Sequence, residues 1–127
     1  MVDQENDDLN KTIGTLEGKK LKPVKVLIRK VEIEPIEKAK AKKVICTCIH
    51  PESDEPIIIS QVKYENKKNK LVPAGLWVIL DEEKHIFKES ALAILMKFLK
   101  CDKIKDLEGK ESDTVTNEDG YLCLKAY

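Results

Sequence analysis

Apolar and polar residues alternate along LKPVKVLIRKVEIEPI, residues 21–36. Apolar residues occupy every second position as far as Ile28, and the alternation then shifts by one residue and resumes at Val31. Because a strand places every second side chain on one face, a shift of one residue indicates a bulge or bend. We therefore predict a long, bent strand that ends at Pro35, since proline cannot donate a hydrogen bond to a sheet.

Three more extended segments follow, each rich in the β-branched and aromatic residues that favour strands. They are KVICTCIH (43–50), EPIIISQVKY (55–64) and LVPAGLWVIL (71–80), and the NKKN sequence at 66–69 predicts a turn between the last two. In the first two segments apolar residues fall on both faces, a pattern typical of strands that are covered on each side.

The single predicted helix lies in KESALAILMKFLKC, residues 88–101. Ser90 is a suitable N-cap, and apolar residues follow from Leu92 at i, i+3, i+4 and i+7 spacing. Two last strands are predicted at 110–116 and 121–127, joined at NEDG, where the Asp-Gly pair is a strong hairpin signal.

This order of elements predicts a mainly β domain with one helix between strands. Five strands in a Greek-key barrel, with a helix before the last two, form the OB-fold arrangement, so we expect an OB-fold-like β-barrel. An α+β roll is the alternative. The length of 127 residues suits a single core. We predict one domain at 21–127, preceded by a flexible acidic tail at 1–20, where no periodicity is visible.

Composition limits the possible partners. Lys+Arg and Asp+Glu both total 23, and Arg29 is the only arginine, so any polyanion binding should be sensitive to salt and weakly specific for sequence. No apolar run approaches the ~20 residues that span a bilayer, and the N-terminus is unlike a signal peptide. We therefore expect a cytoplasmic (intracellular) protein with reduced cysteines and no membrane partner.

The charge is unevenly distributed along the chain. Residues 19–43 hold ten basic and three acidic side chains, and residues 63–70 hold four lysines and one glutamate, whereas 102–119 hold three lysines and seven acids. KAKAK, residues 38–42, falls in the predicted connection between the first two strands, which is a usual binding loop of OB-type barrels. The alternative is a solvated surface of paired lysines and glutamates.

Aromatic side chains supply stacking platforms in proteins that bind single strands. Tyr64 is flanked by lysines, and Trp77 shares a strand face with Ile79, which also allows a packing role. Phe87 and Phe98 are expected in the core. The predicted nucleic-acid-binding residues are Lys25, Arg29, Lys30, Lys38, Lys40, Lys42, Lys43, Tyr64, Lys67, Lys68, Lys70 and Trp77.

Cys46, Cys48 and His50 share one face of a predicted strand, which raises the possibility of a metal site. Zinc prefers ligands from a tight turn together with a second pair, but Cys101 and Cys123 are isolated from each other. We therefore predict core cysteines, an exposed loop position for His50, no metal site and no cofactor.

An enzyme is not expected. His50 and His85 are the only histidines, and neither belongs to a recognisable catalytic arrangement. The chain has no glycine-rich phosphate loop, and the acidic residues of ESDTVTNEDG, 111–120, match no calcium-loop spacing. No catalytic residue is predicted.

Residues 90–127, SALAILMKFLKCDKIKDLEGKESDTVTNEDGYLCLKAY, combine a short helix, a leucine-x-glycine-lysine turn at Leu107, Gly109 and Lys110, and a terminal hairpin. This segment, about a third of the chain, resembles the closing half of small OB-fold proteins encoded near viral or plasmid replication genes. The resemblance implies binding of single-stranded nucleic acid across the sheet face.

Two functions remain open. The first is low-specificity binding of single-stranded nucleic acid, DNA in the first instance, in replication or recombination. The alternative is a β-barrel protein-interaction or assembly module without nucleic-acid binding. It rests on the two-sided apolar strands together with Leu76, Val78 and Leu80, an apolar surface that a second subunit of a homo-oligomer would cover.

Overall fold

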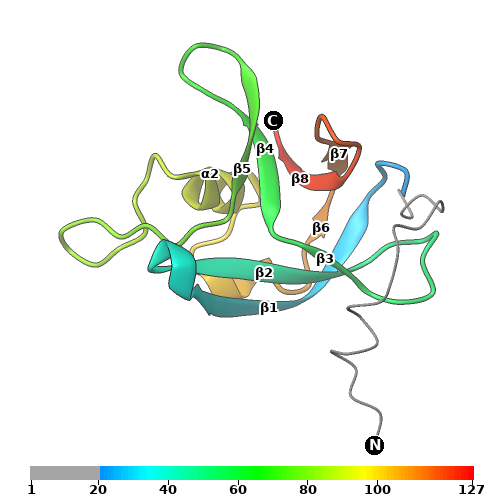
Figure 1. Cartoon of the computed structure of the whole chain (residues 1–127), viewed down its shortest axis with the longest axis horizontal. Helices are drawn as coiled ribbons and strands as arrows, with labels where there is room; N and C mark the ends of the chain where they lie inside the picture. The colour runs from blue at the N-terminus through cyan, green and yellow to red at the C-terminus, as the bar shows by residue number, and fades with distance from the viewer. Residues whose placement is uncertain (1–20) are drawn as a thin grey trace, which may run out of the picture.

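A computed structural model describes residues 21–127, and the tail predicted at 1–20 lies outside the described residues. The described chain is mainly β, with one α-helix and a strongly curled sheet (Figure 1). The predicted mainly β architecture, with a helix between strands, is confirmed at this level.

The strands and helices follow the predicted order, and the segments predicted at 55–64 and 110–116 are each divided into two strands. The elements are β1 (Val26–Ile36), η1 (Glu37–Ala39), β2 (Ala41–Ile49), β3 (Ile57–Ile59), β4 (Gln61–Glu65), β5 (Leu71–Gly75), α2 (Ala91–Phe98), η2 (Ile104–Leu107), β6 (Glu111–Ser112), β7 (Thr114–Thr116) and β8 (Leu122–Ala126).

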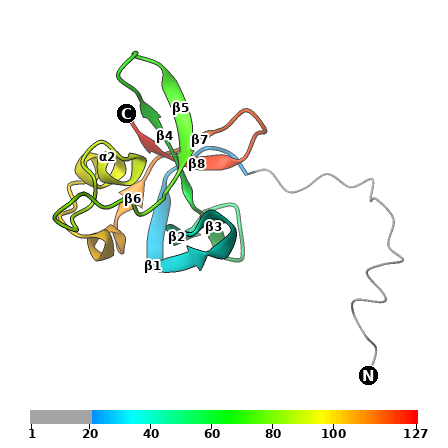
Figure 2. The same ribbon diagram turned by 60° about the vertical axis from the view of Figure 1, so that its left-hand side comes forward.

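The strands form two sheets, with the orders β3-β2-β1-β6 and β5-β4-β8-β7. One residue, Ser60, separates β3 from β4, and one residue, Asp113, separates β6 from β7. Each of these strand pairs therefore passes directly from one sheet into the other, and Figure 2 shows the two sheets meeting. β1 pairs with β2 and β2 with β3; after the crossing at Ser60, β4 pairs with β8 and β8 with β7; after the crossing at Asp113, β6 pairs with β1. β4 and β8 are parallel, and the other pairs are antiparallel.

The predicted bend in the first strand is present. The register of β1 against β2 shifts between Ile28 and Lys30, as a bulge requires. The prediction that Pro35 ends this strand is wrong, because Pro35 pairs with Lys42 and β1 continues to Ile36. β6 pairs only with the start of β1, so this end of β1 has one neighbouring strand, and such an edge tolerates the missing N–H.

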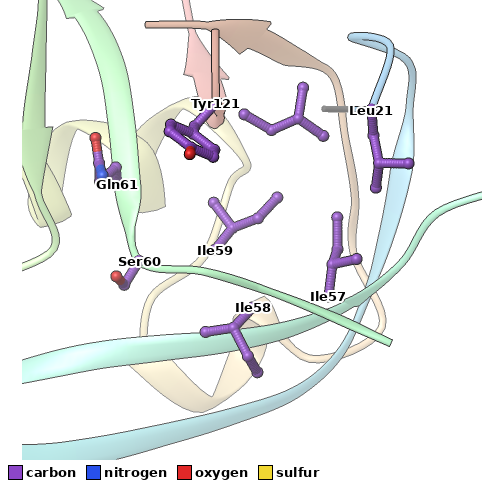
Figure 3. Close-up of a pocket in the computed structure, with 8 residues that line it drawn as sticks. Leu21, Ile57, Ile58, Ile59, Ser60, Gln61 and Tyr121 are labelled. Atoms are coloured by element: carbon purple, nitrogen blue, oxygen red, sulfur yellow. The ribbon is translucent and has the colours of Figure 1, made fainter. Parts of the chain in front are cut away.

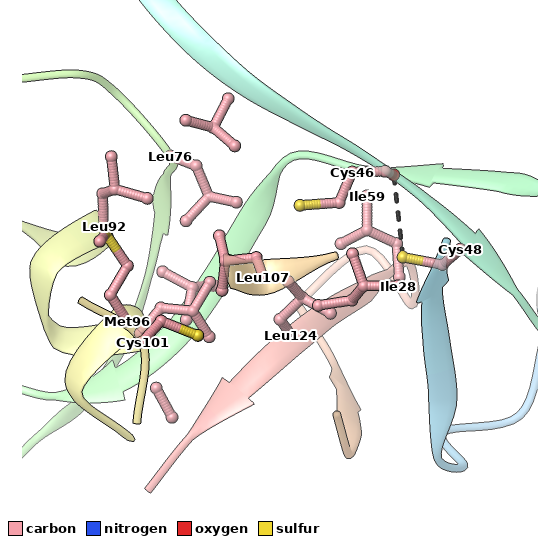
Figure 4. Close-up of a cluster of buried hydrophobic side chains, with 14 of the residues drawn as sticks. Ile28, Cys46, Cys48, Ile59, Leu76, Leu92, Met96, Cys101, Leu107 and Leu124 are labelled. Atoms are coloured by element: carbon pink, nitrogen blue, oxygen red, sulfur yellow. Dashed lines mark hydrogen bonds between the residues drawn. The ribbon is translucent and has the colours of Figure 1, made fainter. Parts of the chain in front are cut away.

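The core lies between the curled strands and the inner face of α2 (Figure 4). Ser90 caps the helix as predicted: its Oγ accepts a hydrogen bond from the Ala93 N–H at 3.2 Å. The fully buried large side chains come from strands, loops and helices alike, namely Val26, Ile28, Val44, Cys46, Cys48, Val62, Leu76, Leu92, Leu95, Leu107 and Leu124. The predicted core positions of Phe87 and Phe98 are wrong, since they are 37% and 49% exposed.

The strands are covered on one face only, which corrects the expectation of two covered faces. Val44, Cys46 and Cys48 point into the core, whereas Ile49 and its cross-strand partner Leu27 are exposed on the outer face. Ile58 on β3 is 61% exposed. The apolar residues on the second face therefore form an uncovered surface, because α2 packs against the inner side of the sheet.

Candidate nucleic-acid interface

Residues 38–40 of the basic segment KAKAK form the predicted exposed connection between β1 and β2, whereas residues 41–42 already belong to β2. Lys38 lies in η1, and Lys40 follows it with a left-handed backbone at φ 51°. Lys38, Lys40 and Lys42 are exposed, and none forms an ion pair within the described part of the chain. We call residues 38–43, the connection together with the start of β2, the lysine loop. Among the described residues, Lys38, Lys40 and Lys42 therefore have no ion-pair partner.

The segment that follows β5 places Trp77 beside the lysine loop. The Val44 N–H donates to the Leu76 carbonyl at 2.8 Å, and the Val78 N–H donates to the Lys42 carbonyl at 2.9 Å. Trp77 is thereby bridged to Lys43, whose Nζ lies 5.1 Å from the centre of the indole ring. A cation over an aromatic face at this distance is a favourable contact.

The backbone next to the indole ring of Trp77 belongs to Gly75. A Cβ on Gly75 would lie 2.8 Å from Nε1 of Trp77, too close for a side chain. Gly75 therefore lets the half-buried Trp77 ring lie close against β5. One side of Trp77 contacts Gly75 and Lys43, and the rest of the side chain lines an open hollow. The packing role and the stacking role considered for Trp77 are therefore compatible.

This hollow, of about 280 Å³, brings together three aromatic side chains from separate parts of the sequence. Its lining residues are Tyr64, Ala74, Gly75, Trp77, Ile79, Phe87, Glu89, Ser90 and Ala91. We call it the aromatic hollow. Phe87 was not among the predicted contact residues. The one local feature that marks Phe87 is its place three residues before the helix N-cap. Its carbonyl accepts hydrogen bonds from the Ser90 N–H and Oγ–H, which fix the residue in front of α2.

A second hollow of about 600 Å³ adjoins the first through Tyr64 and Glu89. Lys67 and Lys68 line it, but Lys67 is engaged: its Nζ lies 2.8 Å from Oε1 of Glu89. This hydrogen-bonded ammonium lowers the pKa of the Glu89 carboxyl. Lys68 and Lys70 are exposed and form no ion pair with any described residue, so the β4–β5 hairpin presents free cations beside the aromatic hollow.

Three predicted contact residues lie elsewhere. Lys30 pairs across the sheet with Thr47, four positions from Lys43 and hence ~13 Å away along β2. It also forms an ion pair with Glu32 at 3.0 Å. Arg29 lies within the bulge and Lys25 precedes β1. The structure therefore divides the predicted set, placing Lys25, Arg29 and Lys30 away from the two aromatic residues.

The predicted core role of the cysteines is confirmed, whereas the exposed position predicted for His50 is wrong. His50 is 1% exposed; Nδ1 accepts from the Glu52 N–H at 3.0 Å, and Nε2 lies 2.8 Å from the Lys22 carbonyl. Only the tautomer with hydrogen on Nε2 satisfies both contacts. The inward alternation of Cys46 and Cys48 continues past the end of β2 and buries His50. Across residues 21–127, no group of three metal-ligating side chains is assembled.

No helix within residues 21–127 has the length and apolar character needed to cross a membrane. No protein-family model, curated protein or solved structure was found to match the chain.

Proposed function

We propose that the protein binds single-stranded nucleic acid, DNA in the first instance, at the lysine loop and the aromatic hollow. The observation that carries this proposal is the contact between Lys43 and Trp77, which joins the unpaired cations of the loop to a hollow lined by aromatic rings. Lysines neutralise phosphates while the rings of Tyr64, Trp77 and Phe87 offer faces for unpaired bases.

The strand order supports an OB-type barrel as part of this proposal. Counting β3 with β4 and β6 with β7 leaves six strands, of which β5 is an additional strand at the edge of its sheet. The other five are paired around the molecule, with α2 between the third and the fourth. This order supports an OB-fold, in which the second and third strands and the loop after the first strand bind oligonucleotides. The resemblance of residues 90–127 to small replication-associated OB-fold proteins points to the same ligand and to a role in replication or recombination.

The chemistry of the interface favours single strands and low sequence specificity. Stacking on Trp77 or Phe87 requires a base that is free of its complementary strand, and every base has a suitable face. Lysine contributes a point charge rather than the planar fork with which arginine reads guanine. We therefore expect weak preference among sequences and strong dependence on salt.

Fluorescence anisotropy of a labelled single-stranded oligonucleotide tests the proposal, at low and moderate salt, with a duplex of the same sequence as control. Quenching of Trp77, the only tryptophan, provides a second readout at the hollow itself. Salt-sensitive binding that favours the single strand is expected. Absence of binding at low salt would refute the proposal.

Substitution of Trp77 by alanine is expected to reduce affinity for the single strand roughly 5- to 150-fold, since one stacked base contributes ~1–3 kcal/mol. Trp77→Phe retains an aromatic face and should lose less. Tyr127→Ala, an aromatic residue outside the hollow, is the matched control. Thermal melts by circular dichroism establish that the variants fold; a folded Trp77→Ala protein with unchanged affinity would exclude stacking at this residue.

Assembly with a second copy of the chain is the alternative function, and the uncovered outer face favours it. Leu27 and Ile49 are opposed across β1 and β2 and are 40% and 36% exposed. Beside them, β3 borders an apolar hollow of about 340 Å³ (Figure 3). Its lining residues are Leu21, Ile57, Ile58, Ile59, Ser60, Gln61, Tyr121 and Leu122. A second subunit would remove this apolar surface from water.

If this face joins two copies, Ile58→Glu should abolish self-association, because a carboxylate would be buried there without a partner. Light scattering over a range of protein concentrations measures the effect. Leu71→Glu, an equal change at another exposed apolar residue, should leave association intact. A wild-type protein that stays monomeric at high concentration would rule out the assembly.

A further inference from the structure

A hollow of about 1060 Å³ lies between residues 84–89 and the C-terminal end of α2. Its rim carries five exposed lysines, namely Lys84, Lys88, Lys97, Lys100 and Lys103, against two acids, Glu89 and Asp102. Apolar side chains, including Ile86, Met96 and Ile104, complete its lining. We call this the lysine groove. None of its lysines forms an ion pair with a described residue.

The lysine groove shares lining residues with the proposed nucleic-acid interface. Glu89 lines all three hollows, and Lys88 lines both the groove and the hollow beside the β4–β5 hairpin. Tyr64 in turn lines that second hollow and the aromatic hollow. The three hollows therefore lie next to one another in succession, from Trp77 past Tyr64 and Lys88 to the groove beside α2.

Three hairpin loops of the protein share one backbone conformation, and a comparison of them shows that lysine is an unusual residue at position 84. In residues 66–70, 81–85 and 117–121, the first side chain, Asn or Asp, accepts hydrogen bonds from the third and fifth backbone N–H groups. The fourth residue is left-handed in each loop, and it is Asn69, Lys84 and Gly120 respectively. Glycine and asparagine are the residues that tolerate this conformation.

Lys100 occupies a second position of this kind. After α2, the Cys101 N–H donates to the Met96 carbonyl at 2.8 Å and the Lys100 N–H to the Lys97 carbonyl at 3.2 Å. These two bonds define a Schellman motif, whose left-handed residue is usually glycine. Here it is Lys100, at φ 60°. Two of the three left-handed lysines, Lys84 and Lys100, line the groove, and the third, Lys40, lies in the lysine loop. In all three places a cation occupies a position where the backbone favours glycine.

We infer that the lysine groove binds the phosphodiester backbone of the same nucleic-acid strand after it leaves the aromatic hollow. The inference rests on the proposed function and extends its site around α2. The five lysines supply contacts to phosphates without reading sequence, and the apolar lining accommodates sugars and base edges. Binding should therefore strengthen with oligonucleotide length until the strand fills the groove.

The double variant Lys84→Gly/Lys100→Gly tests this inference without endangering the fold, because glycine suits both left-handed positions. Oligonucleotides of about 5 and about 15 nucleotides bracket the range of known single-domain sites. The short one, detected by quenching of Trp77, should bind the variant as well as the wild type. The long one should bind several-fold more weakly, with a salt slope lower by about 1.4.

The control replaces two lysines that line none of the three hollows, Lys22→Gln/Lys125→Gln, and it should bind both lengths as the wild type does. A glycine variant that is at least as heat-stable as the wild type, and that binds long strands with unchanged affinity and slope, would overturn the groove inference alone. Failure of the wild type to bind the short strand would instead refute the proposed function, and the inference with it.

Discussion

Replacement of Lys40, Lys42 and Lys43 by alanine is expected to lower the salt slope of single-strand binding by about 2, since each phosphate contact contributes about 0.7. Extrapolated from 1 M to 0.1 M salt, a slope of 2 corresponds to a loss of affinity of about 100-fold. Anisotropy titrations at four or five salt concentrations measure both quantities together.

The structure explains why these three lysines should act together. Lys40 and Lys42 are exposed and unpaired among the described residues, and Lys43 holds its ammonium over the Trp77 ring. Their removal takes charge from the lysine loop, which contacts Trp77 through Lys43, without emptying the core. The matched control is Lys22→Gln/Lys125→Gln, which removes charge elsewhere. A triple variant with unchanged affinity and slope would exclude the lysine loop from the interface.

Stability is expected to fall steeply above pH 9. Burial raises the pKa of the Cys46 thiol to about 12, and burial together with the neighbouring Cys46 raises that of Cys48 to about 12. In the unfolded chain a thiol titrates near ~8.5. The folded state thus retains protons that the unfolded state releases, and this contribution is complete below the unfolded pKa and lost as the pH rises toward 12.

Each thiol should lower the unfolding free energy by up to about 1.4 kcal/mol per pH unit within this window. Urea unfolding at pH 8, 8.5, 9 and 9.5 measures the slope, below the midpoints of the lysine and tyrosine titrations. The Cys46→Ala/Cys48→Ala variant starts from a lower stability, because it loses buried atoms, but its slope should be shallower. Equal slopes for the two proteins would show that these thiols ionise alike in both states.

Local signals in the sequence predicted most of the elements. The shift in apolar alternation near Ile28 corresponds to a bulge in β1, and Ser90 caps the helix. The Asp-Gly pair forms a hairpin turn, with Gly120 at φ 87°. These features depend on a few consecutive residues, so their physical causes are present in the sequence itself. The core position of Cys46 and Cys48 was also predicted, but not which face of β2 is uncovered, because Ile45 and Ile49 make the other face apolar as well.

The assembly of the site depends on contacts between distant residues, which local patterns do not contain. Trp77 reaches Lys43 only because the chain after β5 turns back along β2, and Phe87 meets Tyr64 only through the packing of α2. The lysine groove was missed for the same reason. Its lysines are spread from 84 to 103 among acidic neighbours and become one surface only when the helix and two loops fold together.

The parallel pairing of β4 with β8 has a consequence for synthesis of the protein. Val62 is opposite Leu124, so β4 cannot complete its sheet until 62 further residues have been made. At ~5–20 residues per second this takes roughly 3–12 s, during which one edge of β4 lacks its partner. An unpaired strand edge is a site of aggregation, so slow translation or truncation before β8 should be harmful to yield even though neither alters the proposed interface.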